Sequence, residues 1–254
     1  MDSVDLLRSD VFAGLPVAHG FTARRGGVDH DGRRELTLLA DDSLPPEVLA
    51  ANWARALAAV DPSLSATRLA LVRQVHGDVV LRVTDPTGPL GAAGDADALI
   101  TTVPGLAIAV RVADCVPILL AAPGGVAAVH AGWRGVAAGI APKAAALLAE
   151  AAGCAIGEVR ALIGPHIGQD AFEVGPEVVV VIEATGPSRA TFSRPGRDDR
   201  QHVDLGAALR GQLEALGVGA VASTGGDTTT DRFFSWRADG PRTGRQAGIV
   251  AWLG

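Results

Sequence analysis

The chain lacks several features that define large classes of proteins. Only two cysteines, Cys115 and Cys154, occur in 254 residues, and two are too few for a disulfide framework. The apolar stretches between residues 105 and 130 are interrupted by charges and a proline before they reach the length that a bilayer needs, so we expect no membrane span. Residues 1–10 carry charges throughout, unlike a secretory signal. We therefore expect a cytoplasmic protein.

The chain also lacks a basic block. It has 22 Lys and Arg against 28 Asp and Glu, a formal net charge of −6, so we expect no nucleic-acid partner. The apolar fraction of 48% is ample for a core and excludes disorder as the main state. No linker or repeat divides the chain, and we expect one domain over residues 1–254.

Several catalytic signatures are missing. The six histidines form no His-x-His pair, which a multicopper oxidase would require, and the only methionine is Met1, whereas a blue-copper site usually has an axial methionine. The strings of the zinc nucleobase deaminases, H-x-E with P-C-x-x-C, do not occur. A serine-hydrolase elbow, G-x-S-x-G, is absent as well.

The apolar pattern predicts strands and helices without a strict alternation of the two. Buried strands are expected at Gly105–Val112, Pro117–Ala121, Val126–His130, Val159–Ile163, Ala220–Ser223 and Ala247–Leu253, with a turn at Pro123-Gly124-Gly125. Helices are expected at Val136–Ala152, with a kink or restart at Pro142 and a cap at Gly153, and from the N-cap Asp204 to Leu216. Pro176–Ala184 fits a helix or a strand, and the polar segments Thr22–Arg34 and Ser188–Gln201 are expected to be loops. The fold class is therefore α+β, a mixed β-sheet core flanked by helices.

Three residues stand at the ends of apolar runs, next to small residues: His76, Cys115 and His130. One thiolate and two imidazoles suit Zn²⁺, and three protein ligands leave a fourth position open, as in catalytic zinc sites. The alternative is structural, with Cys115 as a small buried apolar residue and each histidine satisfied locally. No C-x-x-C or H-E-x-x-H string decides between the two.

Other polar segments also allow two interpretations. In the segment His130–Gly135, HAGWRG, Arg134 at the start of a helix indicates either an anion site or a tight turn with a surface ion pair. The segment Gly164–Gly175 holds His166, Asp170 and Glu173, which are either acid–base groups or solvated loop residues. Near the C-terminus, arginines alternate with aromatic residues, which suits stacking of a base or a basic loop over a strand: Arg232, Phe233, Phe234, Trp236, Arg237, Arg242 and Arg245.

Read together, these strings resemble a known family. QVHGDVV, DADALIT, ADCVPILL, VHAGWRG, IGPHIG, FEVG and FFSWRADG…TGRQAG, in this order, are similar to the laccase-domain (polyphenol oxidase-like) family. The likeness runs from FTARRGG at residue 21 to the last strand, and ADC followed by HAGWRG is its most specific part.

The resemblance implies a single-domain mixed α/β sandwich with Zn²⁺ bound by His76, Cys115 and His130, and it leaves Cu²⁺ possible. It implies phosphorolysis of adenosine, inosine and methylthioadenosine, with adenosine deaminase side activity. Small-molecule purine nucleosides and phosphate would be the partners, and the protein would be a monomer or a homodimer. A copper-dependent oxidation of phenols has also been claimed for the family, as has editing of cell-wall precursor peptides, which would make Cys115 and His130 an amidase pair.

Under this interpretation we assign further roles. Asp114 or His166 would protonate a leaving group. Phosphate would be placed by Arg134, or by Arg24 and Arg25. The remaining assignments are Gln74 as a ligand-orienting or ribose-binding residue, and Asp78 and Asp97 as partners of the two histidines.

The sequence departs from the family pattern at three places that we expect to line the pocket rim. Thr37 stands near the usual Asn-Leu pair, Asp227 or a neighbouring threonine replaces a cysteine, and Ala238 replaces the second arginine after FFS. Substrate preference is open at these positions. We expect Cys154 to be an inert residue near a helix end.

Overall fold

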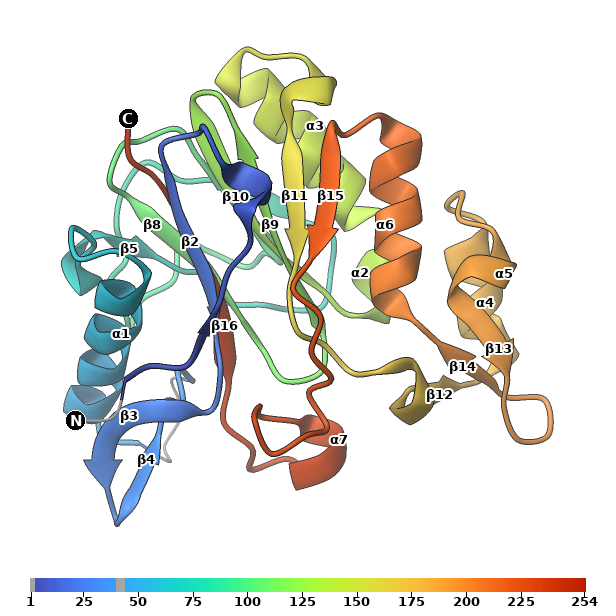
Figure 1. The fold of residues 1–254 in the computed structure, drawn as a ribbon, viewed down its shortest axis with the longest axis horizontal. Helices are drawn as coiled ribbons and strands as arrows, with labels where there is room; N and C mark the ends of the chain where they lie inside the picture. Colours follow the sequence, from blue (N-terminus) through green and yellow to red (C-terminus); the bar gives the residue numbers. More distant parts are fainter. Residues whose placement is uncertain (1–2, 40–43) are drawn as a thin grey trace.

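Two β-sheets packed face to face form the centre of the molecule, as the computed structural model shows for residues 3–39 and 44–254 (Figure 1). The five-stranded sheet has the order β1 (Leu6–Leu7), β2 (Val17–Thr22), β16 (Gln246–Trp252), β8 (Ala107–Val112) and β5 (Leu69–Ala70). The six-stranded sheet has the order β15 (Ala220–Ser223), β11 (Arg160–Ile163), β9 (Val116–Ala122), β10 (Gly125–Ala131), β7 (Ala98–Thr101) and β6 (Val80–Arg82). Neighbours are antiparallel except in the pairs β5–β8, β6–β7 and β11–β15, which are parallel.

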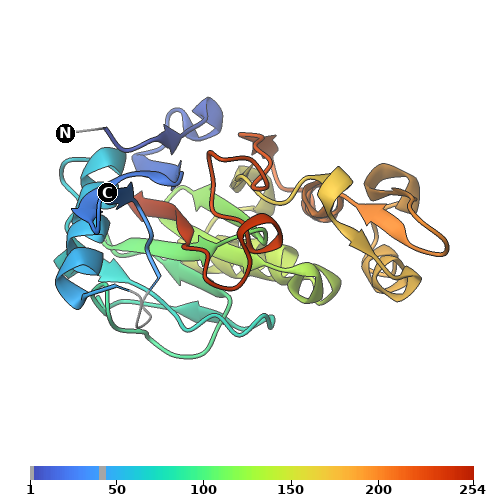
Figure 2. The same ribbon diagram turned by 90° about the horizontal axis from the view of Figure 1, so that it is seen from below.

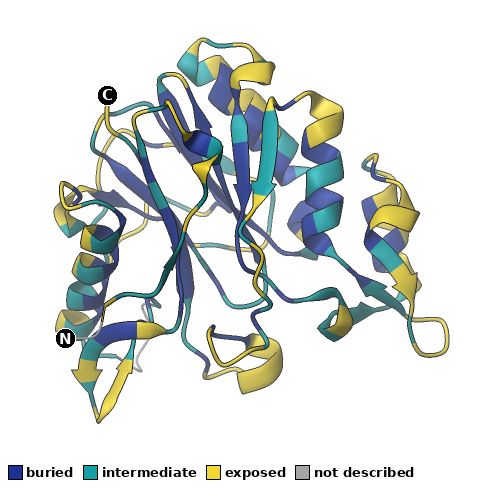
Figure 3. Cartoon of the chain, in the orientation of Figure 1, coloured by how far each residue is buried: buried dark blue, intermediate teal, exposed yellow. Residues whose placement is uncertain are grey.

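Helices cover both outer faces. The helix α1 (Pro46–Val60) packs on the five-stranded sheet through Trp53 and Leu57. On the six-stranded sheet lie α2 (Trp133–Ala137), α3 (Ile140–Ala152), α4 (Pro176–Glu183) and α6 (Leu205–Leu216). The architecture is thus helix, sheet, sheet, helix, and the inner strands are buried on both faces (Figure 3). Continuous apolar runs are what such doubly covered strands require.

The remaining elements are small. A three-stranded sheet of β12 (Glu173–Val174), β14 (Gln201–Val203) and β13 (Ser193–Pro195) lies with α4 and α5 (Arg189–Phe192) at one end of the molecule (Figure 2). The pair β3 (Arg25–His30) and β4 (Arg33–Glu35) forms a hairpin. The helix α7 (Trp236–Asp239) and the 3₁₀ turns Asp10–Phe12, Ala66–Arg68, Ile156–Glu158 and Gln169–Ala171 complete the elements.

The expected α+β sandwich is confirmed, with two central sheets where the sequence indicated one mixed sheet. The predicted strands and the helix capped by Asp204 are present, and the Asp204 side chain accepts a hydrogen bond from the N–H of Ala207. Gly153 ends α3 in the left-handed conformation, as predicted. Among the described residues, no helix is both long enough and apolar enough to cross a bilayer.

Two predicted loops are wrong. Thr22–Arg34 contains β3 and the start of β4, joined by Asp31-Gly32, both with positive φ. Asp-Gly is the preferred pair for this hairpin turn, and it outweighs the polarity of the strands. Ser188–Gln201 contains α5 and β13, because Phe192 is buried in the core and β13 pairs with β14.

Helix boundaries also differ from one expectation. The restart between α2 and α3 is at Gly139, which has φ +69, and Pro142 lies inside the first turn of α3, where a missing N–H costs nothing. The ambiguous segment Pro176–Ala184 is the helix α4. Its buried residues Val178, Val179 and Ile182 follow a helical period, while Val180 is exposed.

Candidate metal centre

Three separate elements bring the predicted ligands together. His76 lies in the segment between β5 and β6, Cys115 in the connection from β8 to β9, and His130 near the end of β10. Their ligand atoms all lie within 4.8 Å of one another, and His76 Nε2 is 3.9 Å from Cys115 Sγ. Within the described residues this is the one group of three or more such side chains.

The group fits a tetrahedral metal. Ligand atoms around zinc lie roughly 3.3–3.8 Å apart, given metal–ligand bonds of about 2.0–2.3 Å, so a small closure of these side chains suffices. His130 Nδ1 lies 2.8 Å from Asp97 Oδ1, which leaves Nε2 for a metal. A Cβ on Gly132 would lie 3.2 Å from both Cys115 Sγ and His76 Cδ2, so the backbone packs directly against two of the ligands.

Asp97 links two of the predicted ligands through hydrogen bonds. Its carboxylate is fully buried and accepts hydrogen bonds from the backbone N–H groups of Val75, His76 and Gly77, at 3.2, 3.0 and 2.7 Å. Burial alone would raise the pKa of this carboxyl, but the hydrogen bonds from His130 and the backbone outweigh it and lower the pKa. One side chain thus fixes the tautomer of one ligand and the backbone of another. The second suggested partner, Asp78, instead pairs with Lys143 at 2.9 Å.

Without a metal, Cys115 and His130 favour a thiolate–imidazolium pair. Burial would raise the pKa of the Cys115 thiol, but the charge and hydrogen bond of His130, together with His76, lower it to about 6. Burial would lower the pKa of His130, but the Cys115 thiolate and Asp97 raise it to about 9. The thiolate is the form that binds a metal. The raised pKa of His130 means that a metal binding at Nε2 must displace the proton there.

The cluster opens onto a cavity of about 650 Å³. Among the described residues that line it, five are arginines and one is an aspartate: Arg73, Arg111, Arg134, Arg237, Arg245 and Asp114. Aromatic and aliphatic side chains form much of the remaining wall: Leu39, Ile167, Phe172, Leu205, Trp133 and Trp236. The cavity therefore combines apolar surfaces with positive charge beside the Cys–His–His group.

The arginines are held in different ways. The guanidinium of Arg111 donates to the carbonyl of Val72 at 3.0 Å, and no carboxylate among the described residues pairs with it. Burial and the nearby charge of Arg245 lower its pKa. Arg73 forms a bidentate ion pair with Asp95. Arg134 stacks on Trp133, with its Cζ 4.3 Å from the centroid of the ring.

Not all of the sequence-derived candidates reach this cavity. Gln74 lines it, but its amide is bonded to the backbone N–H and carbonyl of Arg111. Arg24 holds the backbone of Phe233 and pairs with Asp239, and Arg25 is exposed on β3. Of the residues suggested for phosphate, Arg134 therefore lines the cavity, whereas Arg24 and Arg25 do not.

His166 lies in a second cavity, of about 610 Å³, at the carboxyl ends of β11 and β15. Its Nδ1 is 2.8 Å from the carbonyl of Gly164, and its Nε2 is 3.7 Å from Asp204. Asp227 lies there too and accepts hydrogen bonds from Gly168 and Thr229. Asp170 and Glu173 form ion pairs with Arg194 and Arg197, respectively. His166, Asp170 and Glu173 thus do not line the cavity beside the Cys–His–His group.

The other rim positions have structural partners. Thr37 accepts a hydrogen bond from the N–H of Arg245 at 3.1 Å, and the N–H of Ala238 donates to Ser235 at 3.0 Å. Cys154 follows the cap of α3, as expected of an inert residue. The sequence interpretation missed Arg111 and Phe172. An arginine inside the apolar run of β8 was the available signal for the first.

Comparison with known proteins shows the family. A family model described as multi-copper polyphenol oxidoreductase laccase matches residues 18–253. The chain is 35% identical over 238 residues to a purine nucleoside phosphorylase of Deinococcus radiodurans, covering 93% of this chain and 89% of that protein. It is 37% identical over 238 residues to a purine nucleoside phosphorylase of Mycobacterium tuberculosis, covering 91% and 90%. The crystal structure of YlmD from Geobacillus stearothermophilus is similar with a TM-score of 0.89 and 28% identity, covering 100% and 98% of the two chains.

Proposed function

We infer that this chain, which belongs to the multi-copper polyphenol oxidoreductase laccase family, is a metal-dependent purine nucleoside phosphorylase. The observation that carries the proposal is the His76–Cys115–His130 group on the wall of a cavity that also holds five arginines. The proposed substrate class comes from the names of the relatives, and the proposed metal-binding and phosphate-binding residues come from the cavity lining.

We propose zinc as the metal. A thiolate with two imidazoles is a donor set that zinc prefers, and three protein ligands leave one position for substrate or water. Zinc bound there supplies a Lewis acid that polarises an oxygen or nitrogen of the substrate. A multicopper mechanism has little support, because the described residues hold a single such group and the six histidines form no His-x-His pair.

The proposed phosphate site is formed by arginines. Arg111 is the strongest candidate because it is a partly buried cation without a carboxylate partner among the described residues. Arg245 lies near it, and Arg134 lines the same cavity. Guanidinium groups bind phosphate oxygens through paired hydrogen bonds, so these side chains suit a phosphate ion better than a neutral co-substrate.

The proposed base site is aromatic. Trp133, Phe172 and Trp236 line the cavity, and each has an arginine over one face of its ring. A purine would stack on the opposite ring face or on a guanidinium plane. A phosphate oxygen then attacks C1′ of the ribose while the bond from C1′ to the base breaks and the base leaves with the electron pair. Positive charge on the ribose is stabilised by the phosphate that the arginines position.

Adenosine, inosine and methylthioadenosine are the proposed substrates, with deamination of adenosine as a side activity. Incubation of the purified protein with adenosine, with and without phosphate, tests this by chromatography and mass. Adenine and ribose 1-phosphate formed only with phosphate are the expected result. Inosine in both samples would add the deaminase activity, and unchanged adenosine in both would overturn the proposal.

One observation favours a second candidate, a cysteine amidase. The pKa of Cys115 is about 6 beside His130, which is the arrangement of a thiolate nucleophile and its base. The two functions differ in their response to metal removal. A phosphorylase loses activity with its metal, whereas an amidase stays active until Cys115 is alkylated.

A further inference from the structure

A long segment near the C-terminus forms part of the cavity wall. This C-terminal strap, residues 224–245, joins β15 to β16 and carries α7 across the end of the two sheets (Figure 1). It supplies Trp236, Arg237 and Arg245 to the cavity. Because these residues stand on a segment with a single short helix, their place depends on what holds the strap.

Asp114 is one anchor of the strap. Its Oδ1 accepts hydrogen bonds from the hydroxyls of Thr228 and Ser235, both at 2.7 Å, and its Oδ2 accepts the backbone N–H of Arg237 at 2.7 Å. Ser235 in turn caps α7 by accepting from Ala238. Thr228 and Ser235 are buried, so their hydroxyl contacts with Asp114 are shielded from solvent, whereas the contact from the N–H of Arg237 is exposed. One carboxylate therefore fixes both the start of the strap and the beginning of α7.

The backbone at Asp114 has φ +87, a conformation that residues other than glycine rarely adopt. It directly precedes Cys115, a proposed metal ligand. The carbonyl of Asp114 also accepts the N–H of Ile167, which lines the cavity from the opposite segment. The strained residue thus connects a metal ligand to two walls of the cavity.

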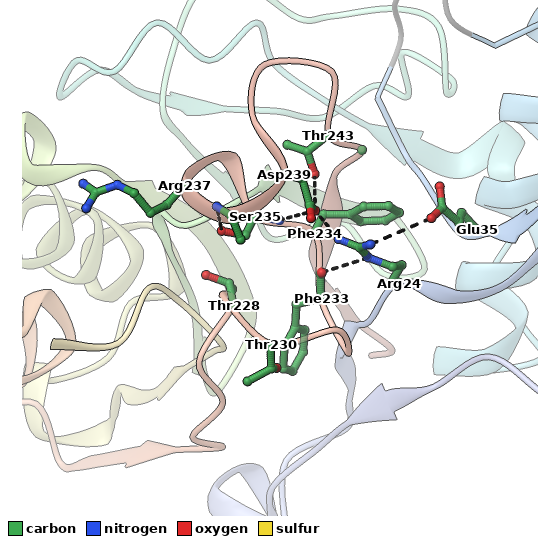
Figure 4. A network of polar contacts seen from close by, with 12 residues as sticks. Arg24, Glu35, Thr228, Thr230, Phe233, Phe234, Ser235, Arg237, Asp239 and Thr243 are labelled. Carbon is green, nitrogen blue, oxygen red and sulfur yellow. Dashed lines mark hydrogen bonds and ion pairs between the residues drawn. The ribbon is translucent and has the colours of Figure 1, made fainter. Parts of the chain in front are cut away.

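The second anchor lies on the far side of α7. Arg24 pairs with Asp239 and donates to the carbonyl of Phe233 at 2.9 Å, while Asp239 accepts from Thr243 at 3.0 Å (Figure 4). This anchor ties the strap to β2 and β3, away from the metal group. Only the Asp114 anchor is continuous in the chain with a metal ligand.

We propose that Asp114 is a positioning residue, which places Trp236 and Arg237 relative to the metal group and so determines substrate binding. The proposal rests on the proposed function and replaces the role of general acid considered for Asp114 from the sequence. Both carboxylate oxygens accept hydrogen bonds from the strap, two at Oδ1 and one at Oδ2.

The variant Asp114→Asn separates the two roles. Its amide keeps one oxygen for the two hydroxyls but presents an NH₂ group to the N–H of Arg237, so α7 must move. We expect KM for nucleoside to rise about tenfold, kcat to stay within about threefold, and metal content to remain that of the wild type. Loss of a general acid would instead lower kcat by about 10²–10⁴, and that outcome with KM unchanged would overturn the proposal.

Two matched variants at Thr228 distinguish the loss of one hydrogen bond from a failure to fold. Thr228→Val keeps the shape of the side chain and removes the hydroxyl, and Thr228→Ser keeps the hydroxyl. We expect Thr228→Val to raise KM by about threefold to tenfold and Thr228→Ser to restore the wild-type KM. Equal kinetics in the two variants would contradict a role for the hydrogen bond to Asp114.

Hydrogen exchange gives a readout that does not depend on turnover. Amides of residues 228–240 should exchange faster in Asp114→Asn than in the wild type, with the rest of the chain unchanged. Arg232→Gln is the control, because it removes two hydrogen bonds to Asp5 from the same strap without touching the cavity. If the wild type cleaves no nucleoside, the proposed function fails, while unchanged exchange in Asp114→Asn would overturn the positioning role itself.

Discussion

Two cavities lined by described residues are nearly equal in size, about 650 and 610 Å³, but differ in their chemistry. The first holds the Cys–His–His group and five arginines, whereas three carboxylates and one arginine line the second: Asp204, Glu214, Asp227 and Arg210. A histidine is present in both. The contrast teaches that the supporting contacts and the sign of the charge, and not the volume, distinguish the cavity proposed as the reactive site.

The supporting contacts differ in the same direction. His130 is buried, and Asp97 fixes its tautomer while holding three backbone amides of the His76 segment. His166 bonds the nearby carbonyl of Gly164, and its contact with Asp204 is longer, at 3.7 Å. In the first cavity the hydrogen bonds hold side chains of separate segments close together, and in the second they mainly stabilise a loop.

The largest expected difference between the cavities comes from their reactive side chains. Cys115→Ala should lose the metal and about a thousandfold in kcat/KM, because a metal contributes several kcal/mol to transition-state stabilisation. His166→Ala should retain activity within about threefold. Metal analysis and kinetics on both variants check this, and a metal-free, active Cys115→Ala protein would exclude the zinc mechanism.

The next difference concerns the two aspartates that organise backbone. Asp97→Asn should weaken metal affinity by about 10–100-fold, since the partner of His130 orients that ligand. Asp227→Asn should leave metal affinity unchanged, because its hydrogen bonds go to Gly168 and Thr229. Competition with a chelator of known affinity measures the metal affinity of both variants. Equal weakening in the two would contradict a specific role of Asp97 in metal binding.

The smallest expected difference separates two arginines. Arg111→Gln should raise KM for phosphate by about tenfold with little change in KM for nucleoside, since it removes one charge-assisted contact. Arg210 pairs with Glu214 and bonds the carbonyl of Val221, so Arg210→Gln should leave both constants unchanged. Kinetics at varied phosphate concentration give KM for phosphate in both variants. An unaltered value in Arg111→Gln would show that Arg111 does not bind phosphate.

The sequence was informative where function depends on local pattern. His76, Cys115 and His130 each follow or end an apolar run, and the resemblance named the same three residues, which the fold brings within 4.8 Å. Strands buried on both faces, such as β9 and β10, were also predicted, because continuous apolar runs indicate them directly.

The rest depends on contacts between distant segments. Nothing near Arg24 in the sequence shows that it pairs with Asp239, 215 residues away. The contacts of Asp114 with Thr228 and Ser235 are between segments more than 100 residues apart, so the sequence alone offered Asp114 only as one of two candidate acids. The sequence predicts loops at β3 and β13 because their residues are polar. Both are strands because each pairs with a neighbouring strand, which polarity does not reveal.

The most direct test of the central claim is to titrate metal-free protein with Zn²⁺ and measure phosphate-dependent release of purine base at each step. The account predicts that activity rises in proportion to bound zinc and stops rising at one ion per chain, and that Cys115→Ala gains neither. Full activity before any zinc is added would contradict it.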